Sequence, residues 1–165
     1  MAAKRSHPPV LNTVTQPGQP SPPRAWRLQR RVLPQHTDHA GVMWHGAYLA
    51  WLEEARVEAL AAVGLAYSAL SARGLELPVV SLSIDYRRPL RHGDEVMVWS
   101  QVEPPRGARL PWRCLFETPA GGVAAEARVD LVALERQEGR QRVMRRLPAD
   151  LQRAVQALTQ GPGPL

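Results

Sequence analysis

The sequence predicts an α+β protein in which an antiparallel sheet of about five strands wraps around one long central helix. A long segment, from Gly46 to Val63, contains no proline and no internal glycine, which favours a helix. Four segments after it alternate apolar and polar residues and are separated by turns rich in Pro and Gly. Because strands joined by short turns pair antiparallel, this order of elements indicates a single sheet with hairpin links.

The chain of 165 residues is long enough for one domain with a substantial core. Residues 1–25 show little apolar periodicity, and their composition is typical of a disordered leader. We therefore expect a Pro-rich leader over 1–25 and a single folded domain over 26–160. The leader prolines are Pro8, Pro9, Pro17, Pro20, Pro22 and Pro23.

The first strand is predicted over 26–33, where alternate positions are apolar until Pro34 ends the pattern. The helix follows a polar loop and ends at Gly64, where a left-handed residue would terminate it. We expect Arg56 and Glu58 on its flanks and Glu53, Glu54 and Val57 on the face opposite the core. Its apolar face is formed by Tyr48, Trp51, Leu52, Ala55, Ala59, Ala62 and Val63.

The segment 65–78 has mixed signals and suggests a short helical piece and a loop. Strands are then predicted over 79–88, 95–103, 109–117 and 123–134, with turns at Pro and Gly clusters between them. A last hairpin is expected within 136–146, around Gly139, and a short amphipathic helix over 148–158.

The composition argues against several classes of protein. No apolar run is long enough to span a bilayer and the N-terminus lacks the apolar core of a signal peptide, so we expect a soluble, cytoplasmic protein without a membrane partner. The single cysteine, Cys114, excludes an internal disulfide. It lies in a predicted strand beside Trp112 and Phe116, which favours core packing over a nucleophilic role.

The formal net charge of +6 means that the surface attracts polyanions. The arginines are scattered along the strands or gathered over 136–146, without the interleaved aromatic residues typical of nucleic-acid binding. We therefore expect no nucleic-acid partner. A basic groove serves a small ligand with several phosphate charges equally well.

The start of the long helix is chemically unusual. No Ser, Thr, Asp or Asn directly precedes Gly46 or Ala47 to cap the first backbone N–H groups, which carry partial positive charge. Asp38 lies seven residues before His45, in a loop that Gly41 makes flexible. A carboxylate that faces oriented N–H groups is suited to hydrolysis of an activated carbonyl, because the donors stabilise the oxyanion.

These residues resemble a known family. The run from Thr37 to His45, with Tyr48-Leu49 and the segment 52–58, is similar to the signature of the hotdog-fold acyl-CoA thioesterases of the 4-hydroxybenzoyl-CoA thioesterase type. That signature is roughly Thr-Asp-x-x-Gly-Val-x-Tyr-His, followed by Asn-Tyr-Leu and a Glu-Arg-Ala-Arg-x-Glu helix. This chain departs from it at Trp44, where Tyr is usual, and at Ala47, where Asn is common.

The resemblance implies a hotdog fold and hydrolysis of an aryl or short-chain acyl-CoA to free acid and CoA, without cofactor or metal. Asp38 would be the catalytic carboxylate, as nucleophile or general base, and the backbone N–H of His45 would polarise the thioester carbonyl. The family also implies a homodimer or homotetramer with the active site at a subunit interface. We expect the substrate to contact Gly41, Val42, Trp44, Gly46, Ala47 and Tyr48, with Arg87, Arg88 and Arg91 near the CoA phosphates.

Other readings of the same residues stay open. Asp38 is also the kind of loop residue that makes a local turn hydrogen bond. His36, His39 and His45 suggest a metal site beside Asp38, although their spacing matches no strong zinc signature. The main alternative function is a non-catalytic module that binds an acyl group or a polyanion through the same fold.

Overall fold

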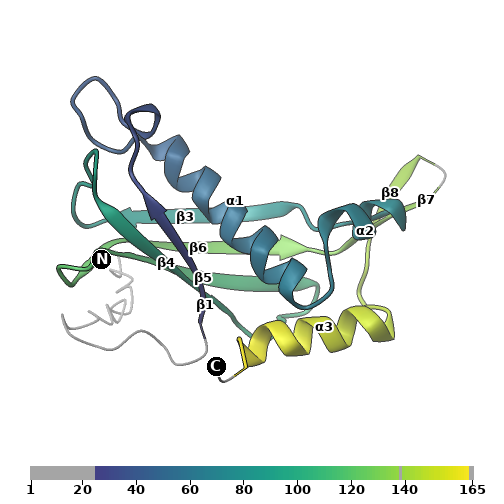
Figure 1. Ribbon diagram of the computed structural model, residues 1–165. Helices are drawn as coiled ribbons and strands as arrows, with labels where there is room; N and C mark the ends of the chain where they lie inside the picture. The colour runs from purple at the N-terminus through teal and green to yellow at the C-terminus, as the bar shows by residue number, and fades with distance from the viewer. Residues whose placement is uncertain (1–24, 138, 164–165) are drawn as a thin grey trace, which may run out of the picture.

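The computed structural model describes residues 25–137 and 139–163, and its main element is a five-stranded antiparallel sheet with strand order β1-β4-β5-β6-β3. Helix α1 lies across one face of this sheet (Figure 1). Apart from Ala25, which is buried, the expected leader lies outside the described residues. The sheet strands are β1 Trp26–Arg31, β3 Val79–Tyr86, β4 Glu95–Val102, β5 Arg109–Glu117 and β6 Val123–Val132.

The two-residue alternation of the sequence gives the sheet one apolar face. Val98 on β4 pairs with Phe116 on β5, and Ala127 on β6 pairs with Ile84 on β3. These side chains lie on the α1 side, where Val98, Phe116 and Ala127 are almost fully buried. The predicted antiparallel sheet is therefore confirmed, and Cys114 lies in its core.

The described residues form three α-helices, the long one and two shorter ones, which lie where the sequence predicts helical segments within 65–78 and over 148–158. They are α1 His45–Ala62, α2 Tyr67–Ala72 and α3 Ala149–Gln160, with a 3₁₀ turn, η1 Pro34–His36, before the first. Gly64 lies two residues after the end of α1 and has a φ of 79°, as expected for a left-handed residue that terminates a helix.

Two expectations for the sides of α1 were wrong. Arg56 was expected on a flank, but only 4% of it is exposed, because the residues after α1 fold back over that side. Its guanidinium forms an ion pair with Glu53 and donates to the Tyr67 hydroxyl at 3.4 Å. Ala62 was expected to be buried and is exposed, since the covered stripe ends at Leu60, which is fully buried.

A second, three-stranded sheet was not predicted. It has the order β2-β7-β8 and is formed by β2 Leu75–Glu76, β7 Leu134–Gln137 and β8 Arg140–Val143. The expected hairpin around Gly139 is the β7–β8 pair. The two residues of β2 join it because Leu75 pairs with Glu135, a contact between distant parts of the chain that has no local signal.

The boundaries of the main strands differ from the prediction by a few residues. The first strand ends at Arg31 and the strand that begins at Val79 ends at Tyr86, because the N–H groups of Arg87 and Arg88 both bond to the carbonyl of Ala124. Within the described ranges, no helix is long and apolar enough to cross a membrane.

Candidate active site

The loop that carries Asp38 is a tight turn closed by its own backbone. The N–H of Asp38 donates to the carbonyl of Val42 at 2.9 Å, and the N–H of Gly41 donates to the carbonyl of Asp38 at 3.0 Å. Gly41 has a φ of 72°, a conformation that a side chain disfavours. The sequence favours this turn because a glycine stands at this left-handed position.

The Asp38 carboxylate takes part in the same turn. Its Oδ1 accepts the N–H of Ala40 at 2.8 Å and that of Val42 at 3.2 Å. The bond from Val42, followed by that from Ala40, lowers the pKa of Asp38 below its usual range, because both donors favour the ionised form. Asp38 is exposed and carries a negative charge at neutral pH. Asp38 therefore makes local turn hydrogen bonds and also presents an exposed, ionised carboxylate.

The loop is attached to the sheet and to the turn before it. The N–H of Met43 donates to the carbonyl of Leu90 at 2.8 Å, and Val42 forms a bridge with Arg91. The N–H of Trp44 donates to the carbonyl of His36 at 3.0 Å. These bonds hold the Asp38 loop between the start of α1 and the segment that follows β3.

Helix α1 begins at His45 without a side-chain cap. The residue before it, Trp44, is extended and makes no capping hydrogen bond with its side chain. The first N–H groups of an α-helix have no partner within the helix, and the helix dipole adds partial positive charge to them. The N–H of Ala47 already donates to the carbonyl of Trp44 at 3.0 Å, so the donors that the helix start offers to an oxygen atom of a ligand are those of the two residues before Ala47.

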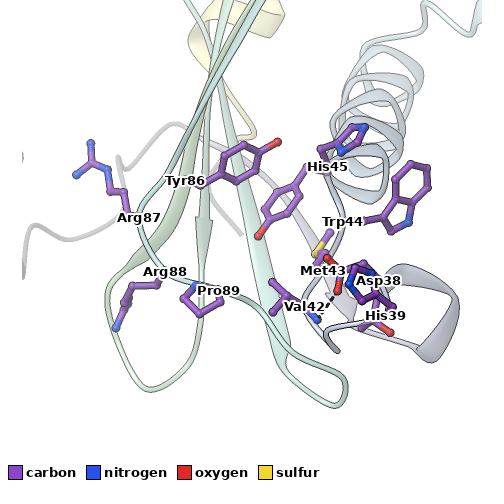
Figure 2. Close-up of a pocket in the computed structure, with 12 residues that line it drawn as sticks. Asp38, His39, Val42, Met43, Trp44, His45, Tyr86, Arg87, Arg88 and Pro89 are labelled. Carbon is purple, nitrogen blue, oxygen red and sulfur yellow. Dashed lines mark hydrogen bonds between the residues drawn. The ribbon is translucent and has the colours of Figure 1, made fainter.

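Asp38 and His45 line the same open cleft, which has a volume of about 790 Å³ (Figure 2). The loop and the start of α1 form one wall, and the end of β3 with the residues after it forms the other. The lining residues are Thr37, Asp38, His39, Val42, Met43, Trp44, His45, Tyr48, Tyr86, Arg87, Arg88 and Pro89.

Four of the expected substrate contacts do not line this cleft. Ala47 is buried on the core side of α1, and Arg91 lies beyond the cleft in the bridge to Val42. Gly46 is covered by the indole of Trp44, because a Cβ on Gly46 would lie 2.1 Å from that ring. Gly41 belongs to the turn rather than to the wall. The remaining residues expected at the site, which do line it, are Asp38, Val42, Trp44, His45, Tyr48, Arg87 and Arg88.

Tyr86 is a lining residue that the sequence interpretation did not select. Its ring meets that of Tyr48 edge to face, with 5.0 Å between centroids. Burial raises the pKa of Tyr48 to about 12, so its hydroxyl stays protonated at neutral pH. The available signal was the position of Tyr86 at the end of an alternating strand, directly before two arginines.

The two lining arginines lie on the wall opposite Asp38 (Figure 2). Arg87 donates to the Glu126 carboxylate at 2.7 Å, so its charge is paired within the protein. Arg88 donates to the carbonyl of Gly121 at 2.9 Å, a neutral partner, and keeps its net charge. A phosphate at this wall would therefore meet one uncompensated cation.

The three histidines near Asp38 do not converge. His36 lies outside the cleft, edge to face with the indole of Trp51 at 5.2 Å, and its Nδ1 accepts the N–H of Leu33 at 3.1 Å. His39 and His45 line the cleft. In the described part of the chain, no three His, Cys, Asp or Glu side chains are grouped as metal ligands would be.

Comparisons with known proteins bear on what such a cleft does. Residues 32–157 match the family model described as the thioesterase-like superfamily. A Synechocystis protein provisionally named as an esterase, sll0410, is 41% identical over 139 residues, 82% of this chain and 81% of that protein. The acyl-CoA thioester hydrolase YbgC of Escherichia coli is 27% identical over 110 residues, 67% of this chain and 82% of the relative.

A solved structure of a 4-hydroxybenzoyl-CoA thioesterase variant, complexed with 4-hydroxybenzoyl-CoA, is similar to this chain with a TM-score of 0.71. The match covers 80% of this chain and 99% of that chain at 20% identity, which shows a shared fold. The prediction of a thioester hydrolase with a hotdog fold is confirmed at the level of the family. This chain belongs to the thioesterase-like superfamily.

Proposed function

We propose that the protein hydrolyses an acyl-CoA thioester to the free acid and CoA. The observation that carries the proposal is that an ionised carboxylate, Asp38, and an uncapped helix start at His45 line the same cleft. The name of the E. coli relative, an acyl-CoA thioester hydrolase, supports the same substrate class.

In the proposed reaction the thioester carbonyl lies at the start of α1. The N–H of His45 donates to the carbonyl oxygen, and its bond strengthens as negative charge develops on that oxygen. Asp38 either removes a proton from a water molecule that attacks the carbonyl carbon, or attacks that carbon itself. The carbon–sulfur bond then breaks, and the CoA thiolate leaves and takes up a proton. When Asp38 is the nucleophile, a water molecule afterwards hydrolyses the acyl–Asp38 anhydride, which releases the free acid and restores the carboxylate. Both routes require the ionised form of Asp38.

Aromatic side chains around the cleft favour an aryl or short acyl group. Trp44 is 43% exposed and Tyr86 is 53% exposed, so both rings are accessible to a ligand. Tyr48 lines the cleft on the α1 wall with Trp44, whereas Trp51 is buried in the core and does not line the cleft. Flat rings bind aryl groups well through edge and face contacts.

The test is thiol release from a panel of aryl-, short- and long-chain acyl-CoA esters by wild type and by Asp38→Asn. The substitution is nearly isosteric, so we expect loss of about a hundredfold or more in kcat with an unchanged fold. Asp150→Asn is the matched control, because it makes the same chemical change on α3, away from the cleft. An unchanged rate in Asp38→Asn would contradict the role of Asp38. Binding without any hydrolysis would favour the non-catalytic acyl- or polyanion-binding module.

The second part of the proposal is a homodimer formed by pairing of β3 with β3 of a second copy. Strand β3 is an edge of the sheet, and none of its eight residues is buried. Val79, Val80, Leu82 and Tyr86 are exposed, and Asp85 is the only charged residue of the strand. An unpaired edge that is long, apolar and nearly uncharged favours addition of another strand.

Light scattering after gel filtration tests the dimer. We expect a dimer for wild type and a monomer for Leu82→Glu, because the new charge would lie in the apolar interface. Arg27→Glu on β1, at the opposite edge of the sheet, is the control and should remain dimeric. A wild-type monomer at micromolar concentration would contradict the dimer and leave the hydrolytic proposal standing.

A further inference from the structure

A strongly basic segment, β8 and the residues directly after it, lies far from the cleft. Strand β8 and the two residues after Met144 carry four arginines, and β8 is exposed along its whole length. None of the four forms an ion pair with another residue in the described ranges, although Glu135 lies opposite Arg142 in the ladder. We call this set the hairpin arginines; it comprises Arg140, Arg142, Arg145 and Arg146.

The cleft has too few free cations for a ligand with several phosphate charges. Arg87 is neutralised by Glu126, which leaves Arg88 as the uncompensated guanidinium among the lining residues described above. CoA carries a diphosphate and a 3′-phosphate. Phosphate groups are best bound by the planar fork of arginine, and one fork serves one phosphate group.

The hairpin arginines cannot reach the cleft of their own chain. Val79 begins β3 beside the three-stranded sheet, since β2 ends only three residues before it, whereas Tyr86 ends β3 at the cleft. Eight residues of β3 span about 27 Å. Figure 1 shows the β7–β8 hairpin beyond one end of β3 and the loop before α1 at the other.

In a twofold dimer, by contrast, the hairpin of one subunit lies close to the cleft of the other. When β3 pairs antiparallel with its copy, the Val79 end of one strand lies beside the Tyr86 end of the other. The β7–β8 hairpin of one subunit is thereby brought next to Arg88 and Pro89 of the other. The geometry points to a shared site, which rests on the proposed function and dimer: the hairpin arginines of one subunit bind the CoA phosphates at the cleft of its partner.

The inference predicts a specific kinetic change when the four arginines are replaced by glutamine. KM for an acyl-CoA should rise about tenfold or more, because charge-assisted bonds to phosphate are lost. Neither kcat nor the kcat/KM for the matching acyl N-acetylcysteamine ester, which lacks the nucleotide and its phosphates, should change. The control replaces four exposed arginines elsewhere, so that the net charge changes equally: Arg27, Arg31, Arg106 and Arg153.

Mixed dimers, co-expressed with two different tags and purified through both, decide whether the contact is made between subunits. The first mixed dimer pairs an Asp38→Asn subunit that keeps its hairpin arginines with an Asp38 subunit that lacks them. If the site is shared, the intact Asp38 faces intact arginines and KM for the acyl-CoA is that of wild type. The reciprocal dimer pairs a wild-type subunit with one that carries both changes, and its KM should be raised.

The opposite pattern in the two mixed dimers, or an unchanged KM in the fourfold homodimer, would overturn the inference. So would a monomeric wild type, or an equal rise of KM in the control. If the fourfold variant is misfolded by circular dichroism, Arg140→Gln with Arg142→Gln replaces it. A wild type that hydrolyses no thioester refutes the proposed function instead. Calorimetric titration with free CoA and with pantetheine then still tests the arginines, which should affect CoA alone.

Discussion

The rings of Tyr48 and Tyr86 meet edge to face, with 5.0 Å between centroids and 77° between planes. Tyr48 lies in the first turn of α1 and Tyr86 ends β3, so this contact joins the helix to the edge strand at the cleft. Tyr48 also meets Phe116 in the core at 5.1 Å and is 2% exposed, whereas Tyr86 is 53% exposed. One ring is therefore structural, and the other is available to a ligand.

Replacement of Tyr86 should affect aryl substrates most. Since an aromatic pair contributes about 1 kcal/mol beyond its area, Tyr86→Ala should lower kcat/KM for an aryl-CoA about fivefold. The kcat/KM for acetyl-CoA should change less, and Tyr86→Phe should resemble wild type because the ring is kept. Steady-state kinetics on both esters checks this. An equal loss for the two esters would show that Tyr86 acts through the shape of the cleft wall and not through the acyl group.

The lowered pKa of Asp38 predicts the pH profile of hydrolysis. Hydrogen bonds from Val42 and Ala40 favour the carboxylate, so the active, ionised form is present above the usual Asp pKa and is lost only as the pH falls below it. We therefore expect kcat/KM to be constant from neutral pH down to about 5, with an acid limb below about 3.9. A limb near pH 6 would contradict the assignment of Asp38 as the essential base or nucleophile.

Cys114 should be unreactive in the folded protein. It is 2% exposed, and burial raises the pKa of its thiol to about 11, while the Ser100 hydroxyl lies 3.4 Å from its Sγ. A thiol reagent such as dithionitrobenzoate should label it only in denaturant. Cys114→Ala should retain activity within about twofold and lose about 1 kcal/mol of stability. Rapid labelling of the native protein, or a large loss of activity, would contradict this prediction.

Glu126 should be important for stability, because the residue is only 8% exposed and its carboxylate is shared by several arginines. It accepts from Arg87 at 2.7 Å and from Arg113 at 2.9 Å, and Arg128 lies 3.8 Å away. Glu126→Gln should lower the free energy of unfolding by about 1–3 kcal/mol, because the arginines that bond to Glu126 would lose the negative charge that compensates theirs.

Urea denaturation measures this effect, with Asp130→Asn as the control. Asp130 makes a single, more exposed ion pair with Arg109 on the same face of the sheet, so its loss should cost less than about 1 kcal/mol. Equal costs for the two substitutions would show that the shared carboxylate has no special role.

The Glu126→Gln substitution should also release the Arg87 guanidinium from its ion pair at the cleft. If Arg87 then binds a phosphate of the substrate, KM for an acyl-CoA should fall.

The local sequence was sufficient for the main sheet, for α1 and for the Asp38 turn. Alternation with a period of two determines which strand residues face the core, whatever the neighbouring strand is. Gly41 and Gly64 occupy left-handed positions in the structure, as glycine permits and other residues disfavour. The absence of a side-chain cap before α1 could also be predicted from the sequence, because capping depends on the residues next to the helix start.

Contacts between distant segments decided the rest. The pairing of Leu75 with Glu135, the burial of Arg56 against Tyr67, and the meeting of Tyr48 with Tyr86 each join residues whose own neighbours contain no sign of the partner. The same holds for Arg87, which was expected to be free for phosphate and is paired with Glu126, 39 positions away. Local patterns determine the conformation of a segment, but the partner of a side chain depends on how the packed segments are arranged in space.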